Sequence, residues 1–144
     1  MSLVFAGVCS HAPGITGRSE RAEPSVRDAF YQAFHRMRVA LEASQPDALV
    51  IIGAEHFANF FMDNMPAICM GMADFYEGPI EDEGWLGIPS RRVLGNSALS
   101  ERLLRLVMED IDLAYAQEWK LDHGIMVPLH FLLPGDNFPL IPVN

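Results

Sequence analysis

The sequence lacks several patterns that mark particular classes of protein. It has no apolar run approaching the roughly 18 residues of a membrane-spanning helix, and no signal-peptide pattern. It contains only two cysteines, Cys9 and Cys69, and both lie in apolar runs. We therefore expect buried free thiols rather than a disulfide. Together these absences predict a cytoplasmic protein with no membrane partner.

Positive charge is also scarce. The chain has 10 Lys and Arg against 19 Asp and Glu, a formal net charge of −9. This balance speaks against a nucleic-acid partner, because binding to phosphates requires a basic surface. No glycine-rich phosphate loop, Gly-x-Ser-x-Gly elbow or paired-cysteine zinc pattern is present. The acidic residues cluster at 77–83, which we interpret as a solvated loop.

Two apolar runs each end in a histidine. Leu3 to Cys9 leads into His11, and Leu49 to Ile52 leads into His56. Short continuous apolar runs predict strands that are buried on both faces. In open α/β sheets the functional groups collect beyond the carboxyl ends of the strands. We therefore expect His11 and His56 to lie close together.

Between these runs, residues 24–44 have apolar side chains at helical spacing, with Pro24 suited to the first turn and Glu23 or Ser25 as the cap. Strand, helix and strand in this order predict a right-handed parallel βαβ unit. His35 lies beside the apolar face of this helix, and we expect it at the surface.

The remaining sequence predicts further strands and helices around a single core. Strands are expected at 66–70, 113–121 and 138–144, the second of them near a sheet edge because it is partly polar. Helices are expected from Asn96 or Ser97 and over 126–132, the first of them burying Leu99, Leu103, Leu106 and Val107. Residues 73–95 show neither the apolar spacing of a helix nor that of a strand, and we expect them to form a long functional loop.

These elements indicate one α/β domain over residues 1–144, with a mostly parallel or mixed central sheet flanked by helices. Because the sequence ends inside an apolar strand, we expect the sheet to be incomplete there. An unpaired edge at Val143 predicts self-association or strand exchange.

The histidines suggest a metal site. Oxygen chemistry at Fe(II) uses two histidines and one carboxylate on one face, and His11 and His56 supply two nitrogens. The alternative is that each histidine caps a strand end by bonding to backbone. Glu55 would point away from a metal bound by its neighbour His56. No third, carboxylate ligand is therefore found in this chain.

A third histidine, His123, lies between Asp122 and Gly124. The carboxylate of Asp122 would orient the ring, and Gly124 would permit close backbone approach. The neutral-range pKa of histidine suits acid–base work on a phenolic or hydroxyl proton. His123 would alternatively be a third metal ligand, which suits a zinc hydrolase using His11, His56 and His123. We expect His130 to be a structural histidine.

Several motifs resemble those of the class III extradiol ring-cleavage dioxygenases, typified by the protocatechuate 4,5-dioxygenase beta subunit. They are Ser10-His11-Ala-Pro, Glu55-His56-Phe, Phe60-Phe61-Met-Asp with Met65-Pro66, Asp82-Glu-Gly-Trp85, and Asp122-His123-Gly with Val127-Pro128-Leu129. The resemblance implies that His11 and His56 bind non-haem Fe(II) and that His123 is catalytic. It also implies cleavage by O₂ of a catecholic aromatic acid, such as protocatechuate, gallate or dihydroxyphenylpropionate.

The resemblance implies that this chain corresponds to the N-terminal half of the family's catalytic domain. The family's carboxylate ligand lies in the other half, and the family has Asp where this chain has Glu55. We therefore expect little activity from these residues alone, and a homo-oligomer or a second subunit that completes the site. The alternative of another class is a non-catalytic scaffold, which would have no need of metal.

Overall fold

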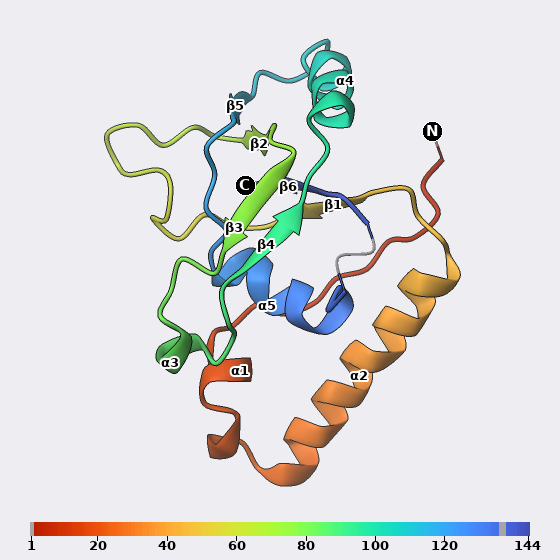
Figure 1. Cartoon of the computed structure of the whole chain (residues 1–144), viewed down its shortest axis with the longest axis vertical. Helices are drawn as coiled ribbons and strands as arrows, with labels where there is room; N and C mark the ends of the chain where they lie inside the picture. The colour runs from red at the N-terminus through yellow and green to blue at the C-terminus, as the bar shows by residue number, and fades with distance from the viewer. Residues whose placement is uncertain (1, 136–137) are drawn as a thin grey trace.

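The computed structural model describes residues 2–135 and 138–144 and confirms the predicted α/β class (Figure 1). Its central sheet has the strand order β1 (Leu49–Ile52), β6 (Leu140–Val143), β2 (Cys69–Gly71) and β5 (Ala114–Ala116). The β1–β6 and β2–β5 pairs are parallel, and the β2–β6 pair is antiparallel. The sheet is therefore mixed, and β5 is at an edge, as predicted.

Helices pack on both faces of this sheet, but one face of β1 is uncovered. Val50 and Ile52 are 46% and 79% exposed, so the expectation that this strand is buried on both faces is wrong. Ile141 of β6 packs with Met70 and with Leu104 of α4 (Ser97–Val107), whereas Leu140 packs into the main core around α5 (His123–Leu132). This alternation follows from the two-residue period of a strand. Since β6 lies between β1 and β2, the unpaired edge expected at Val143 is wrong for the strands described.

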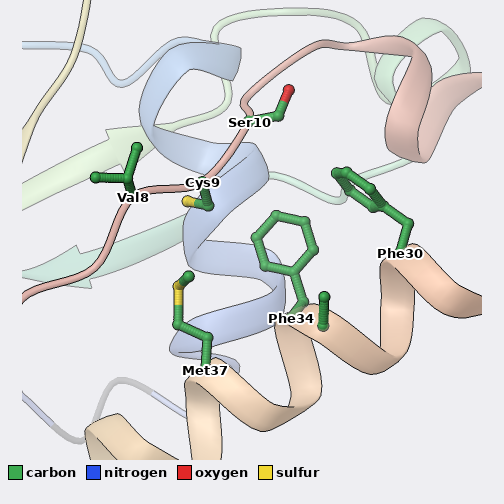
Figure 2. Close-up of a pocket in the computed structure, with 7 residues that line it drawn as sticks. Val8, Cys9, Ser10, Phe30, Phe34 and Met37 are labelled. Carbon is green, nitrogen blue, oxygen red and sulfur yellow. The ribbon is translucent and has the colours of Figure 1, made fainter.

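The strand expected over Leu3 to Cys9 is not formed. Residues 2–10 have no regular secondary structure, Leu3 and Val8 are 86% and 93% exposed, and β1 pairs with β6 instead. The expected βαβ unit is therefore wrong. Part of this segment lies beside α2 (Pro24–Ala43), and Figure 2 shows Cys9 above Phe34 in a small apolar pocket. Only Phe5 and Cys9 of this run pack against the cluster around Phe34 and Leu41, and its other residues are exposed.

The predicted long helix is confirmed as α2. The Glu23 carboxylate accepts a hydrogen bond from Val26 N at 3.1 Å, and Pro24 occupies the first turn. Phe34 and Leu41 are buried, and the Phe34 ring stacks on Phe131 of α5 at a centroid distance of 4.5 Å. His35 is exposed, as expected.

Residues 73–95 are more ordered than predicted. They contain an antiparallel hairpin of β3 (Phe75–Gly78) and β4 (Arg91–Leu94), and a short helix, α3 (Glu83–Leu86), between the strands. Tyr76 and Val93 are buried, but each strand has only four residues. An alternation of buried and exposed side chains over only four residues is too short to be recognised in the sequence among the surrounding glycines and prolines.

The later helices begin close to where they were expected. Asn96 caps α4 by accepting from Leu99 N at 2.9 Å. Its fully buried residues are Ser100 and Leu104, which were not predicted. Of the predicted face, Leu99, Leu103 and Val107 are half-buried, whereas Leu106 is 52% exposed and was predicted wrongly. α5 begins at His123, which places this histidine in a helical first turn.

Two short helical turns, α1 (Gly14–Gly17) and η1 (Ser19–Arg21), complete the fold. The main core collects buried side chains from α5, the hairpin and the strands: Cys69, Tyr76, Leu86, Ile88, Val93, Trp119, Leu121, Ile125, Met126, Val127, Leu129, Leu133 and Leu140. Across residues 2–135 and 138–144, no helix combines the length and hydrophobicity needed to cross a bilayer.

Both cysteines are free, as predicted, with Cys69 buried and Cys9 partly buried. Burial raises the pKa of the Cys69 thiol from 9.0 to about 11. Between these two values the unfolded chain loses a proton that the folded chain keeps, so the free energy of unfolding should fall as pH rises from 9 towards 11. Urea titrations at pH 8 and pH 10 should show a shallower decline in the Cys69→Ala variant. An equal decline in both proteins would contradict this prediction.

Candidate functional site

Three histidines from distant parts of the chain converge. His11 follows the N-terminal segment, His56 follows β1, and His123 begins α5. The ring centroids are 4.2 Å apart for His56 and His123, 5.2 Å for His11 and His56, and 6.2 Å for His11 and His123. The predicted proximity of His11 and His56 is thus found, although His11 arrives without a strand.

The residues after His11 are held by two contacts. The Tyr31 hydroxyl of α2 donates to the Ile15 carbonyl oxygen at 2.9 Å. Gly17 of α1 lies so close to α3 that a Cβ there would be 2.1 Å from the Trp85 carbonyl oxygen. This close approach places the His11 loop beside α3, and only glycine permits it.

The surroundings of His11 favour its neutral form. Burial is the main cause that lowers the pKa of His11, and the neighbouring His56 and His123 lower it further. Asp122 opposes this effect. A neutral imidazole is the form that has a lone pair available to a metal or a proton.

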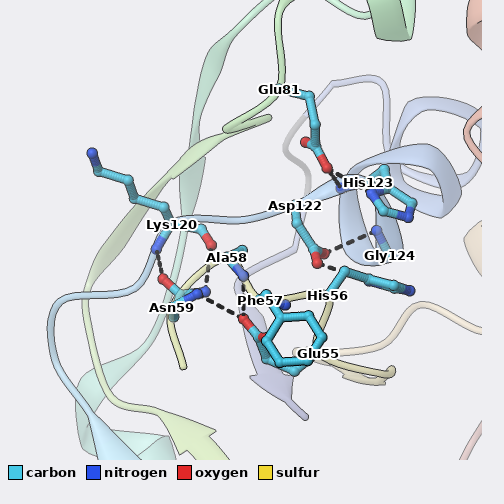
Figure 3. Close-up of polar contacts among 10 residues, drawn as sticks. All are labelled: Glu55, His56, Phe57, Ala58, Asn59, Glu81, Lys120, Asp122, His123 and Gly124. Atoms are coloured by element: carbon cyan, nitrogen blue, oxygen red, sulfur yellow. Dashed lines mark hydrogen bonds and ion pairs between the residues drawn. The ribbon is translucent and has the colours of Figure 1, made fainter. Parts of the chain in front are cut away.

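Asp122 orients His56 rather than His123, contrary to the prediction. Its Oδ2 lies 2.8 Å from His56 Nδ1, while Oδ1 accepts from Gly124 N at 2.9 Å, and Asp122 is 3% exposed (Figure 3). Asp122 is the N-cap of α5, so its carboxylate lies over the first turn of that helix. The His56 ring also packs there and contacts the carboxylate. Because a carboxylate only accepts, His56 Nδ1 carries the proton and the neutral ring keeps a free lone pair on Nε2.

Gly124 makes this packing possible. A Cβ at this position would lie 3.0 Å from His56 Cε1 and 2.9 Å from Asp122 Oδ1. Both distances are shorter than ordinary contacts, so the close backbone approach expected of this glycine is present.

Glu81 orients His123, and sequence reasoning missed it. Its Oε1 accepts from His123 N at 2.9 Å and lies 2.6 Å from His123 Nδ1 (Figure 3). The Trp85 ring lies edge-on to His123 at 6.2 Å. Glu81 belongs to the acidic cluster interpreted as a solvated loop, and no local pattern separates it from its neighbours in that cluster.

Glu55 points away from the histidines, as expected. Its carboxylate accepts hydrogen bonds from the backbone N–H groups of Phe57, Ala58 and Asn59, closing a turn in which Phe57 has a positive φ of 59°. The Asn59 side chain then pairs with the backbone of Lys120 through two bonds of 2.9 Å. These bonds fasten the turn after His56 to the segment that leads to Asp122.

The tightest group of potential metal ligands differs from the expected pair. One ligand atom each from His56, Asp122 and His123 lie within 4.8 Å of one another. His11 adjoins this group through its ring contacts. His130, which was expected to be a structural histidine, is exposed and lies edge-on to Phe131 at a ring-centroid distance of 5.0 Å.

Comparison with known proteins places this site in a family. A family model described as "Catalytic LigB subunit of aromatic ring-opening dioxygenase" matches residues 6–144. Three relatives named as 2,3-dihydroxyphenylpropionate/2,3-dihydroxicinnamic acid 1,2-dioxygenases are similar to the chain. The Pseudomonas putida protein is 33% identical over 82% of this chain, that of Rhodococcus globerulus 30% over 93%, and that of Escherichia coli K12 32% over 93%.

The matched part is a fraction of each relative. The chain covers 36% of the Pseudomonas protein and 41% of each of the other two. The family match, in contrast, extends over nearly the whole of this chain and includes all three converging histidines. The protein therefore belongs to the LigB family of aromatic ring-opening dioxygenases.

Proposed function

We propose that the protein takes part in Fe(II)-dependent extradiol cleavage of a catecholic aromatic acid by O₂. The observation that carries this proposal is the convergence of His11, His56 and His123, with the last two rings each held through Nδ1 by a buried or half-buried carboxylate. Membership of the ring-opening family and the names of the relatives support it.

The donor set fits a divalent metal. Ligating histidines usually donate their other ring N–H to a carboxylate, as His56 does towards Asp122. In the proposal His11 and His56 hold Fe(II), and Asp122 fixes the His56 ring with Nε2 free. When bound, the metal would bring the catechol and O₂ together and polarise the two catechol oxygens.

His123 is the proposed acid–base residue. Glu81 holds the Nδ1 side of the ring, so Nε2 remains available to take a proton from a catechol hydroxyl and to return it. Trp85 borders His123 and is 43% exposed, so a flat aromatic substrate would find an apolar surface beside the base.

The proposal includes assembly. We expect a homo-oligomer or a second subunit to supply the carboxylate ligand, and the protein to act in the cytoplasm. Sedimentation velocity across a concentration series should show association, with no nucleic acid or membrane required. A concentration-independent monomer that nevertheless cleaves catechols would contradict the assembly.

The test of function is oxygen uptake by the protein reconstituted with Fe(II) under anaerobic conditions. Protocatechuate, gallate and dihydroxyphenylpropionate are offered separately. From this chain alone we expect little activity, and from the assembly that supplies the carboxylate ligand we expect oxygen uptake with a yellow ring-opened product from at least one substrate. The zinc-loaded protein is the matched control. No uptake by that assembly, while a relative is active in the same assay, would contradict the proposal.

The same experiment separates the other candidates. Three convergent histidines also suit zinc, so a zinc hydrolase using His11, His56 and His123 predicts zinc retained after dialysis and no oxygen consumption. A scaffold predicts that neither metal is retained.

Asp122 offers a sharper test of the metal site. In the Asp122→Asn variant, the side-chain amide can donate to His56 Nδ1 and drive the proton to Nε2, which removes the lone pair proposed for the metal. We expect affinity for Fe(II) to fall by about 10- to 100-fold, the usual effect of losing such a partner. Anaerobic titration measures it, with exposed Asp112→Asn as the control. Equal affinities in both variants would contradict the assigned role.

A further inference from the structure

His56 and His123 each have their own carboxylate. Asp122 contacts His56, and Glu81 contacts His123, so the sequence neighbours Asp122 and His123 are not partners. We propose that Glu81 is the positioning residue of His123: it fixes the tautomer with the proton on Nδ1 and aims the unprotonated Nε2 at the reacting groups. This inference deepens the proposed function and, for its catalytic part, rests on it.

Backbone contacts bring Glu81 to His123. Ile80 N donates to the Leu121 carbonyl oxygen at 2.9 Å, and Leu121 N donates to the Glu77 carbonyl oxygen at 2.8 Å. A Cβ on Gly78 would be 2.7 Å from the Leu121 Cβ, so the two segments lie as close as their backbones allow. Glu81 therefore stands beside His123 because the neighbouring backbone is already paired.

The Glu81 carboxylate is committed to this histidine. Its Oε1 accepts from both the backbone N–H and the ring of His123, and the two side chains are only 17% and 14% exposed. Oε2 is buried and has no hydrogen-bond partner among the described residues. Partial burial of a carboxylate is costly, and no hydrogen bond to Oε2 from the residues that the structure describes offsets that cost. Its contacts with His123 are the interactions that hold it in place.

The tautomer follows from these contacts. An ionised carboxylate cannot donate, so the nitrogen 2.6 Å away must carry the proton, and the neutral ring has its lone pair on Nε2. That nitrogen is the one a general base needs. A residue that only capped α5 would require the backbone contact and leave the tautomer free.

The tautomer can be measured without metal. Long-range ¹H–¹⁵N NMR on the metal-free protein with ¹⁵N-labelled histidine reports which ring nitrogen carries the proton, and the His123 signals are assigned by their loss in a His123→Asn variant. We expect Nδ1–H for His123. A proton on Nε2 in the wild-type protein overturns the proposal, whether or not any variant folds.

Three variants test the role of the carboxylate. Glu81→Met keeps the side-chain length but has no oxygen, and we expect His123 to shift towards the Nε2–H form while His56, held by Asp122, is unchanged. Glu81→Gln keeps an acceptor oxygen and should retain the wild-type tautomer. The exposed neighbour Glu83→Gln is the control. An unchanged His123 tautomer in E81M overturns the proposal.

Catalysis provides the second measurement. With Fe(II) bound, E81M should lower kcat for ring cleavage by up to the roughly 10²–10⁴-fold that a positioned acid–base group contributes, with KM nearly unchanged. Unchanged kcat would overturn the catalytic part. If the wild-type protein cleaves no catechol, the proposed function fails, while the tautomer measurement still decides whether Glu81 positions His123.

Discussion

Replacement of His56 by alanine is expected to abolish stoichiometric iron binding and ring cleavage. His56 lies nearest the centre of the histidine group, with its ring 4.2 Å from His123 and 5.2 Å from His11. Its loss also leaves Asp122, which is 3% exposed, without the ring that faces Oδ2. Because loss of an outer partner alone costs about 10- to 100-fold in metal affinity, loss of the ligand itself should cost more.

Anaerobic Fe(II) titration and oxygen uptake measure this effect. His35→Ala is the matched control, because His35 is exposed on α2 and remote from the other histidines in the sequence. Near-UV circular dichroism should show both variants folded. An H56A protein that binds one equivalent of iron with wild-type affinity would remove His56 from the proposed ligands.

Replacement of Gly17 by alanine is expected to have the second largest effect. The added Cβ would lie 2.1 Å from the Trp85 carbonyl oxygen and 3.2 Å from the Leu86 carbonyl carbon. Both are backbone atoms and cannot rotate away, so α1 must separate from α3. Overpacking of this kind costs about 1–3 kcal/mol. The displacement should also move His11 away from His56 and weaken iron binding.

Gly14 supplies the control for this change. It lies in the same short helix, and a Cβ there would meet no atom within 4 Å. Urea unfolding and Fe(II) titration of the two variants should therefore differ clearly. If G17A and G14A are equally stable and bind iron alike, α1 and α3 are not tightly docked as described.

The long helix α2 was predicted correctly. The helix α2 combines a capping glutamate, a proline in its first turn and a regular apolar stripe, so neighbouring residues alone determine it. The hairpin β3–β4 was missed because four-residue strands are stabilised by pairing with each other and by burial of Tyr76 and Val93. Such information lies in the packing and not in the local pattern.

The site was predicted in part for a similar reason. His11, His56 and His123 were recognisable because each is a histidine flanked by turn residues. The carboxylate partners of two of them were not recognisable, because they are distant in the sequence. His56 pairs with Asp122, 66 positions away, and His123 pairs with Glu81, 42 positions away. The adjacent Asp122 was the natural choice for His123, yet helix capping turns that carboxylate towards His56.

The central position of β6 also bears on how the protein is made. β1, which leads to His56, has only β6 as a strand partner within the described part of the chain, and β6 is the last of those strands to be synthesised. On the ribosome, β1 must therefore wait for residues 140–143 before it can be paired. Contacts this distant in sequence slow folding, because the intervening chain must be closed into a loop first. During that interval Leu49 and Ile51, which pack against the main core in the folded protein, would be exposed and open to aggregation.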